Sequence, residues 1–266
     1  MGVIMKKIII LTFILSLSFN CLGQTETSDE SNKPRVYILQ QVPFSENLEQ
    51  LSALDKEELD KILNNYLDYE PKSLDKIAFK LGSDIADALV CLKAKNSVKL
   101  REIVKNLPHY GEVLGISEEF LRLSVSLSPL IKEEKWDGIK EKLEEYHQKI
   151  LKELYNMNSL DHIVLVQLGG WIKGIADISY VLKEPENYSR EKTKIFYNKN
   201  MILALGHDIA NIHEESEIPK PYIVKAKTNL KRMKVIIYSA INETYSLTDI
   251  KDLNKLANEI IIEFAL

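Results

Sequence analysis

The segment ILALGHDIANIHEE (202–215) contains the residues best suited to metal chemistry. His207 and Asp208 are adjacent, and His213 follows shortly after them. Imidazole nitrogens and carboxylate oxygens ligate divalent metals, and a bound metal can activate water. On a helix, however, His207 and His213 point about 120° apart, so they cannot chelate one ion as an i,i+4 pair would. His213 falls in the apolar stripe near the helix end, where we expect a hydrogen-bonded boundary histidine or a partner of the helix dipole.

The stretch LGHDIAN (205–211) resembles the His-Asp segment of the HD phosphohydrolase family. This resemblance implies a metal-dependent hydrolase with His207 and Asp208 as metal ligands. Such a site also requires an upstream histidine and a downstream aspartate. The candidates for these two positions are His147, His162, Asp249 and Asp252.

A pattern L-G-x-D-I-A occurs in both KLGSDIAD (80–87) and ALGHDIAN (204–211). An internal duplication explains it, and chance similarity between amphipathic helices is the alternative. The first copy has Ser83 where the second has His207, so the scaffold does not require a histidine there. On a helical wheel the glycines fall on the apolar face, whereas His207 and the two aspartates, Asp84 and Asp208, face solvent.

Glycine inside a helix costs about 1 kcal/mol relative to alanine. We therefore interpret Gly82, Gly170, Gly174 and Gly206 as positions where neighbouring helices pack closely. The same wheel places Lys80, Ser83 and Asp87 on the polar side of the first copy. This interpretation favours packing over a ligand role for the glycines.

A small set of residues is the candidate ligand-binding site. Trp171 lies beside Gly170 and close to Gly174, where it lines a pocket between helices or, alternatively, packs in the core. His213 completes this set. Cys91 is placed on the polar side of its helix and nothing supports a catalytic thiol there. Three lysines that share one helix face form either a solvated surface or a patch for an acidic partner: Lys227, Lys231 and Lys234.

The N-terminus has the pattern of an export signal. Two lysines precede the apolar run 8–19, and CLGQ follows it. This pattern predicts a signal peptide over 1–23, cleaved before Gln24, and it resembles the leaders of exported bacterial proteins. The alternative is a lipoprotein anchored through Cys21, although SFNC is a poor lipidation sequence. We expect a periplasmic or cell-surface protein without a transmembrane helix in its mature chain.

The rest of the chain predicts a tether over 24–44 and one all-α domain over 45–266, an irregular bundle of about nine helices. Asp55, with Glu58, and Ser73 are the expected N-caps of the first two helices. The apolar helix 159–183 is expected at the centre. The predicted helices span 54–69, 73–95, 97–106, 117–127, 137–157, 159–183, 189–215, 221–244 and 248–265, with a loop at 107–117 and an end near Pro129.

Composition and the absence of known motifs disfavour several classes of function but do not identify one. The chain has 35 basic and 39 acidic side chains, and two of the basic ones lie in the leader, so the mature protein is mildly acidic and a poor binder of nucleic acid. No phosphate-binding loop, dinucleotide fingerprint or hydrolase motif occurs. We therefore expect a non-catalytic exported protein that needs no cofactor and binds an unknown protein or small molecule in the cell envelope. The alternatives are the metal-dependent hydrolase and a lipid-tethered structural protein.

Overall fold

The computed structural model describes residues 35–40, 44–116, 122, 125–212 and 220–266. The chain divides into two units, Met1–Arg35 and Val36–Leu266. The predicted signal peptide (1–23), most of the predicted tether and His213 lie outside the described residues.

The second unit is an all-α multi-helix bundle, as the sequence predicts. No strand occurs in the part of the chain that the structure describes, and the isolated bridge between Ile241 and Thr244 is its only β-type pairing. The helices are α1 (Phe44–Gln50), η2 (Leu51–Ala53), α2 (Lys56–Asn64), α3 (Leu74–Ala94), α4 (Ser97–Val104), α5 (Leu107–Val113), α7 (Leu127–Lys132), α8 (Trp136–Asn156), α9 (Leu160–Leu182), η3 (Lys192–Phe196), α10 (Lys199–Asn211), α11 (Pro221–Tyr238) and α12 (Leu247–Ala265).

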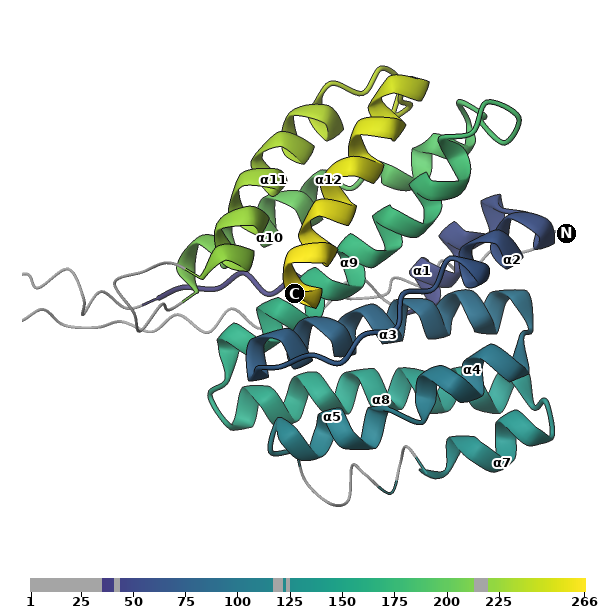
Figure 1. Ribbon diagram of the computed structural model, residues 1–266, viewed down its shortest axis with the longest axis vertical. Helices are drawn as coiled ribbons and strands as arrows, with labels where there is room; N and C mark the ends of the chain where they lie inside the picture. The colour runs from purple at the N-terminus through teal and green to yellow at the C-terminus, as the bar shows by residue number, and fades with distance from the viewer. Residues whose placement is uncertain (1–34, 41–43, 117–121, 123–124, 213–219) are drawn as a thin grey trace, which may run out of the picture. The chain divides into compact units, whose positions relative to one another are not determined.

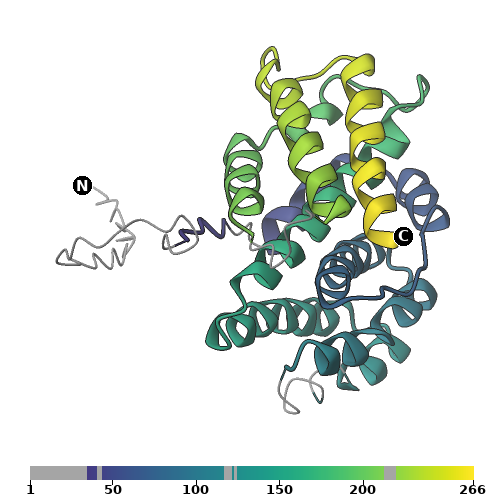
Figure 2. The same ribbon diagram turned by 60° about the vertical axis from the view of Figure 1, so that its left-hand side comes forward.

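Helices α3 and α9 pack against each other at the centre of the bundle. In Figure 1, α10, α11 and α12 lie on one side of this pair, and α4, α5, α7 and α8 lie on the other. Figure 2 shows the same division after rotation. The sequence predicts the central place of α9, but α3 is equally enclosed, with few of its residues reaching solvent between Ile77 and Leu92. A helix that is surrounded by other helices has no solvent face, so its polar side chains need partners in the interior.

The predicted helix starts are confirmed. The Asp55 carboxylate accepts a hydrogen bond from the backbone N–H of Glu58, and the Glu58 carboxylate accepts one from the backbone N–H of Asp55. Ser73 Oγ accepts from the backbone N–H of Lys76. These bonds satisfy N–H groups that have no partner inside the first turn of a helix.

Several predicted boundaries are wrong: α1 precedes the first predicted helix, α2 ends at Asn64, and the predicted helix 189–215 is divided into η3 and α10. Helix α5 forms inside the predicted loop, with Pro108 in its first turn, where a missing N–H leaves no hydrogen bond unmade. Helix α7 contains Pro129 in its first turn, so this proline lies near a helix start and not a helix end. Helix α11 ends at Tyr238, and the following turn places Asn242 and Glu243 at positive φ.

Glycines allow α3 and α9 to approach until their backbones touch. A Cβ on Gly82 would lie 1.9 Å from the carbonyl oxygen of Val166, and one on Gly169 would lie 2.0 Å from that of Phe79. A Cβ on Gly170 would lie 3.3 Å from the carbonyl oxygen of Gly82. The packing role predicted for Gly82 and Gly170 is confirmed, and Gly169, which the sequence analysis passed over, belongs with them.

The same prediction is wrong for Gly174 and Gly206. A Cβ built on either residue meets nothing within 4 Å. Neither glycine therefore permits a close helix contact. Gly174 instead borders a hollow in the bundle.

Candidate functional site

A cavity of about 160 Å³ lies beside the contact between α3 and α9. The middle of α9 supplies Gly170, Trp171 and Gly174 to its wall, and Trp171 is partly buried against the core. These are three of the four ligand-binding residues predicted from the sequence. Most of the wall is apolar, and it includes Ile85, Leu89, Leu151, Ile175, Phe196 and Met201.

Three of the polar side chains that line the cavity have buried atoms without a hydrogen-bond partner. They are His147 from α8 and Gln167 and Asp177 from α9. The unpaired atoms are His147 Nδ1, both side-chain polar atoms of Gln167, and Asp177 Oδ2. A buried polar atom left unpaired typically costs about 1–3 kcal/mol. Their position on the cavity wall indicates that groups entering the cavity can satisfy them.

Two of the polar groups on the cavity wall are well separated along α9. Gln167 and Asp177 are ten residues apart on one helix, which corresponds to about 15 Å along its axis. Gly170, Trp171 and Gly174 lie between them. Burial lowers the pKa of His147 to about 4, so its imidazole is neutral at pH 7 and can accept a hydrogen bond at Nδ1.

One edge of the cavity is formed by the beginning of the helical unit. Gln40, Asn47 and Gln50 line this edge, and Gln40 is exposed. We call Val36–Gln40 the N-terminal segment; it has no helical structure. Because an exposed residue contributes to the wall, the cavity reaches solvent beside this segment.

A buried charge cluster joins α9 to α3 at the Asp177 end. The Lys173 ammonium donates to Asp87 Oδ1 at 2.7 Å and also contacts Asp177 Oδ1. Burial alone would lower the pKa of Lys173, but the two carboxylates outweigh burial and raise it. Burial raises the pKa of Asp177 although Lys173 opposes the shift. Asp177 therefore has one oxygen held by lysine and one without a partner in the cavity wall.

A second buried pair lies on α3, where the wheel predicted a solvated face. Lys80 Nζ lies 2.6 Å from Asp84 Oδ1, and both side chains are essentially inaccessible. The ammonium group also lies 4.9 Å from the ring centres of Tyr66 and Tyr69. Burial raises the pKa of Asp84 to about 6 even though Lys80 opposes it. The predicted exposure of these two residues is wrong because they pair with each other inside the bundle, and Tyr66 and Tyr69, from the segment after α2, cover the ammonium group.

The predicted positions of Ser83, Asp87 and Cys91 on the polar side of the helix are also wrong. All three are buried, and Ser83 Oγ is within hydrogen-bond distance of the carbonyl oxygens of Phe79 and Gly169. Burial raises the pKa of the Cys91 thiol, which makes the nucleophilic thiolate scarce at neutral pH.

Asp208 is buried, contrary to its predicted exposure, whereas His207 is 43% exposed, as predicted. The Asp208 carboxylate accepts hydrogen bonds from the backbone N–H groups of Ile38 at 2.7 Å and Leu39 at 2.9 Å. His207 Nδ1 lies 3.0 Å from the same carboxylate. Asp208 thus holds the N-terminal segment against α10, and the sequence gives no local sign of a partner so distant along the chain.

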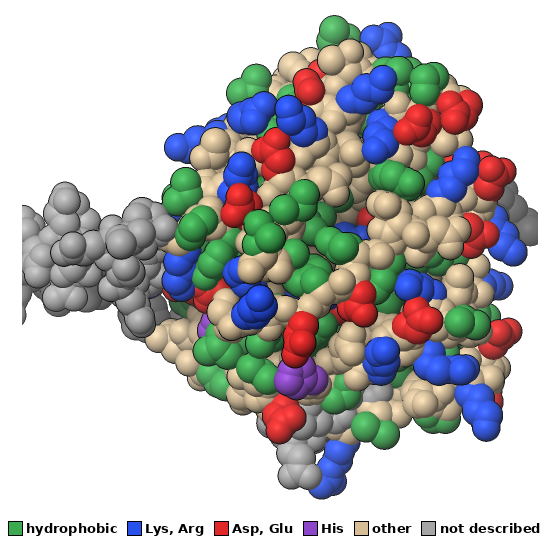
Figure 3. Space-filling view, viewed as in Figure 1, with side chains coloured by type: hydrophobic (Ala, Val, Ile, Leu, Met, Phe, Trp, Pro, Cys, Tyr) green, Lys and Arg blue, Asp and Glu red, His purple; other side chains and the backbone are tan. Residues whose placement is uncertain are grey.

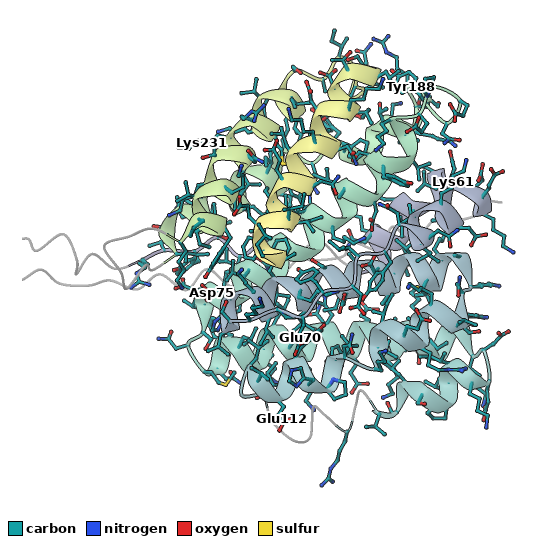
Figure 4. All side chains as sticks on the ribbon, in the orientation of Figure 1. Lys61, Glu70, Asp75, Glu112, Tyr188 and Lys231 are labelled. Atoms are coloured by element: carbon teal, nitrogen blue, oxygen red, sulfur yellow. The ribbon has the colours of Figure 1, made fainter. Side chains whose placement is uncertain are left out.

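The other histidine that could complete an HD-type site, His162, has a different neighbour. His162 Nε2 lies 3.5 Å from Asp75, which also accepts hydrogen bonds from Lys220 and Tyr222. Figure 4 shows Asp75 at the end of α3 nearest the start of α11. Burial would raise the pKa of Asp75, but the three donors hold it well below its usual range. The cluster joins α3, α9 and α11.

The remaining HD candidates are dispersed. His147 lines the cavity, Asp249 caps α12 through Ser246, and Asp252 is exposed. Among the described residues, no three His, Cys, Asp or Glu side chains are grouped so as to hold a metal ion. The residues that the resemblance to HD phosphohydrolases names are therefore not brought together in the described structure.

The predicted lysine face of α11 lies at the surface. Figure 4 shows Lys231 on the outer side of this helix, and Lys234 is also exposed. Basic and acidic side chains are interspersed over the face of the molecule in Figure 3. That pattern is typical of a solvated surface.

Sequence reasoning missed His147, Gln167, Lys173 and Asp177 as a group. A signal was present, because Gln167, Lys173 and Asp177 are polar residues within the otherwise apolar helix α9. Such residues require partners in the interior. Lys173 and Asp177 also repeat the four-residue spacing of Lys80 and Asp84.

Comparison of the chain with protein families, curated proteins and solved structures found no match. Within the described residues, no helix combines the length and the apolar character that crossing a membrane requires.

Proposed function

We propose that this protein is an exported, non-catalytic binding protein that holds a small molecule in the cavity beside α3 and α9. The observation that carries the proposal is the coincidence of an apolar cavity with unpaired polar atoms on His147, Gln167 and Asp177. Ligand sites typically combine apolar walls with a few polar groups that fix the ligand's orientation. The export pattern of residues 1–23 supports a role in the cell envelope.

The volume of the cavity suits a compact ligand. An engineered cavity of about 150 Å³ in another protein accommodates benzene. The cavity here is about 160 Å³ and has unpaired polar groups in its wall. We therefore expect a molecule with a small apolar body and at least one hydrogen-bonding group.

Gly174 provides a direct test because it borders the cavity without contacting a neighbour. Gly174→Leu places an apolar side chain in the cavity without forcing a helix apart. Gly206→Leu is the matched control, since Gly206 also has free space around it but does not line the cavity. Calorimetric titration with phenethylamine, phenethyl alcohol and phenylacetate measures binding to both variants and to the native sequence.

We expect at least one probe to bind the native protein and the Gly206→Leu variant, and to bind Gly174→Leu at least about tenfold more weakly. Absence of binding by all three probes would refute the proposal, as would binding that Gly174→Leu leaves unchanged. Mass spectrometry of the N-terminus of protein from its native host tests export separately. A mature chain starting at Gln24 supports a periplasmic protein, and a lipidated Cys21 supports an anchored one.

A further inference from the structure

The buried charges beside the cavity do not balance. On α9 and α3, one ammonium group, that of Lys173, serves two carboxylates, those of Asp87 and Asp177. The neighbouring pair on α3 is balanced, with one lysine for one aspartate. With all these groups ionised, the cluster has one negative charge in excess, and a buried unbalanced charge is strongly disfavoured.

The cavity reaches this cluster through Asp177, because Asp87, whose Oδ2 is also buried and unpaired, does not line the cavity. Asp177 Oδ1 contacts Lys173, whereas Asp177 Oδ2 is buried, has no partner and belongs to a residue that lines the cavity. The whole Asp177 residue is 4% exposed. A proton or a cationic group in the cavity would therefore neutralise the cluster through this oxygen.

The rest of the wall favours a cation over an anion. Among the described residues that line the cavity, only His147 and Asp177 ionise, and no lysine or arginine contributes. Burial keeps His147 neutral at pH 7. A carboxylate or phosphate in the cavity would meet no positive partner, whereas an ammonium group would meet Asp177.

We infer that the cavity selects a small monoamine, whose protonated amino group pairs with Asp177 Oδ2 and whose apolar body lies along Gly170, Trp171 and Gly174. This inference rests on the function proposed above. Gln167, ten residues before Asp177 on α9 and so about 15 Å away along the helix axis, can receive a neutral polar group of a longer ligand. The ammonium group supplies the missing positive charge and donates a charge-assisted hydrogen bond to the unpaired oxygen.

The three probes of the preceding experiment share one ring and differ in charge, so their ranking tests this inference. We expect native protein at pH 7.5 to bind phenethylamine at least about tenfold more tightly than phenethyl alcohol, and phenylacetate most weakly. Equal binding of the amine and the alcohol would overturn the amine inference and leave the proposed function standing. Failure of all three probes would overturn both.

Asp177→Asn locates the effect. The asparagine has the shape of the aspartate without its charge, and Lys173 retains Asp87 as a partner. We expect the amine to lose its advantage of about tenfold while the alcohol binds as before. An advantage that survives in a folded Asp177→Asn variant would contradict the assignment to Asp177. If circular dichroism shows that this variant does not fold, the ranking of the three probes on the native protein decides the inference alone.

Discussion

Alanine substitutions at Gly82 and Gly206 distinguish the steric cost of a helix–helix contact from the gain in helix propensity. Gly82→Ala places a methyl group 1.9 Å from the carbonyl oxygen of Val166, whereas Gly206→Ala places one where no atom lies within 4 Å. Both changes replace glycine inside a helix, which by itself stabilises the helix by about 1 kcal/mol. The two variants therefore share a propensity gain and differ in steric cost.

The steric cost at Gly82 follows from the distance. Real Cβ atoms essentially never lie within 3.0 Å of such an atom, so α3 and α9 must separate by about 1 Å at their crossing. Overpacking a well-packed core typically costs about 1–3 kcal/mol, and a backbone that cannot rotate away places this site at the upper end. After the propensity gain, we expect Gly82→Ala to lower the free energy of unfolding by about 2 kcal/mol and Gly206→Ala to raise it by up to about 1 kcal/mol.

Urea and thermal unfolding followed by far-UV circular dichroism measure both changes. In a domain of this size, 1 kcal/mol corresponds to about 2–4 °C in Tm, so Gly82→Ala is expected to lower Tm by about 4–8 °C. Gly174→Ala is a second control and is expected to behave like Gly206→Ala, because it too has free space. A Gly82→Ala variant as stable as the native protein would refute the backbone contact between the two central helices.

Three further predictions follow from the buried polar groups. His147→Gln removes an imidazole whose pKa burial lowers to about 4. Because the same imidazole is protonated near pH 6.5 in the unfolded chain, the free energy of unfolding of the native protein falls by up to about 3 kcal/mol between pH 6.5 and 4. The variant is expected to lack this pH-dependent component. A native-minus-variant difference in urea stability that does not change with pH would contradict this, and the buried carboxyl groups cancel in that difference. Asp84→Ala leaves the Lys80 charge buried alone and is expected to lower the free energy of unfolding by about 3–5 kcal/mol. Lys80→Met combined with Asp84→Leu is expected to restore it to within about 1 kcal/mol of native. A double variant no more stable than the single one in urea unfolding argues against a paired charge. Asp208→Ala removes the acceptor for two N–H groups of the N-terminal segment and is expected to speed proteolysis of that segment. His207→Ala changes an exposed residue and is expected to leave the rate of cleavage unchanged. Equal cleavage of both variants would show that Asp208 does not hold the segment against α10.

Local chemistry in the sequence was enough to predict the class of fold and several helix starts. Apolar residues at helical spacing predict an all-α bundle, and the capping residues Asp55 and Ser73 fix where α2 and α3 begin. Both signals act within one or two turns of chain, so they do not depend on the remainder of the protein. The long apolar run of α9 likewise predicts a central helix, since a helix apolar on most sides must be enclosed.

The helical wheel predicted solvent exposure for polar residues that are buried because the folded chain supplies them with partners. Asp208 is predicted to face water, yet its carboxylate is buried because it binds backbone N–H groups near the start of the helical unit. Asp84 is buried for a different reason: α3 is enclosed, and Lys80, one turn away on the same helix, supplies the opposite charge. Hydropathy assigns each side chain to water or to the core by type alone and takes no account of such partners.

Sequence alone determined the all-α class, the central place of α9 and the starts of α2 and α3, because apolar spacing and caps act through neighbours along one helix. The contacts at Gly82 and Gly170 depend on a second helix, and the same glycine rule is wrong for Gly174 and Gly206. Only the tertiary structure decided that Gly174 faces a cavity and that Asp177 lines it. A cavity is the space that several helices fail to fill, and a charge imbalance depends on which lysine reaches which carboxylate. Both are set by the relative placement of helices that are distant in sequence.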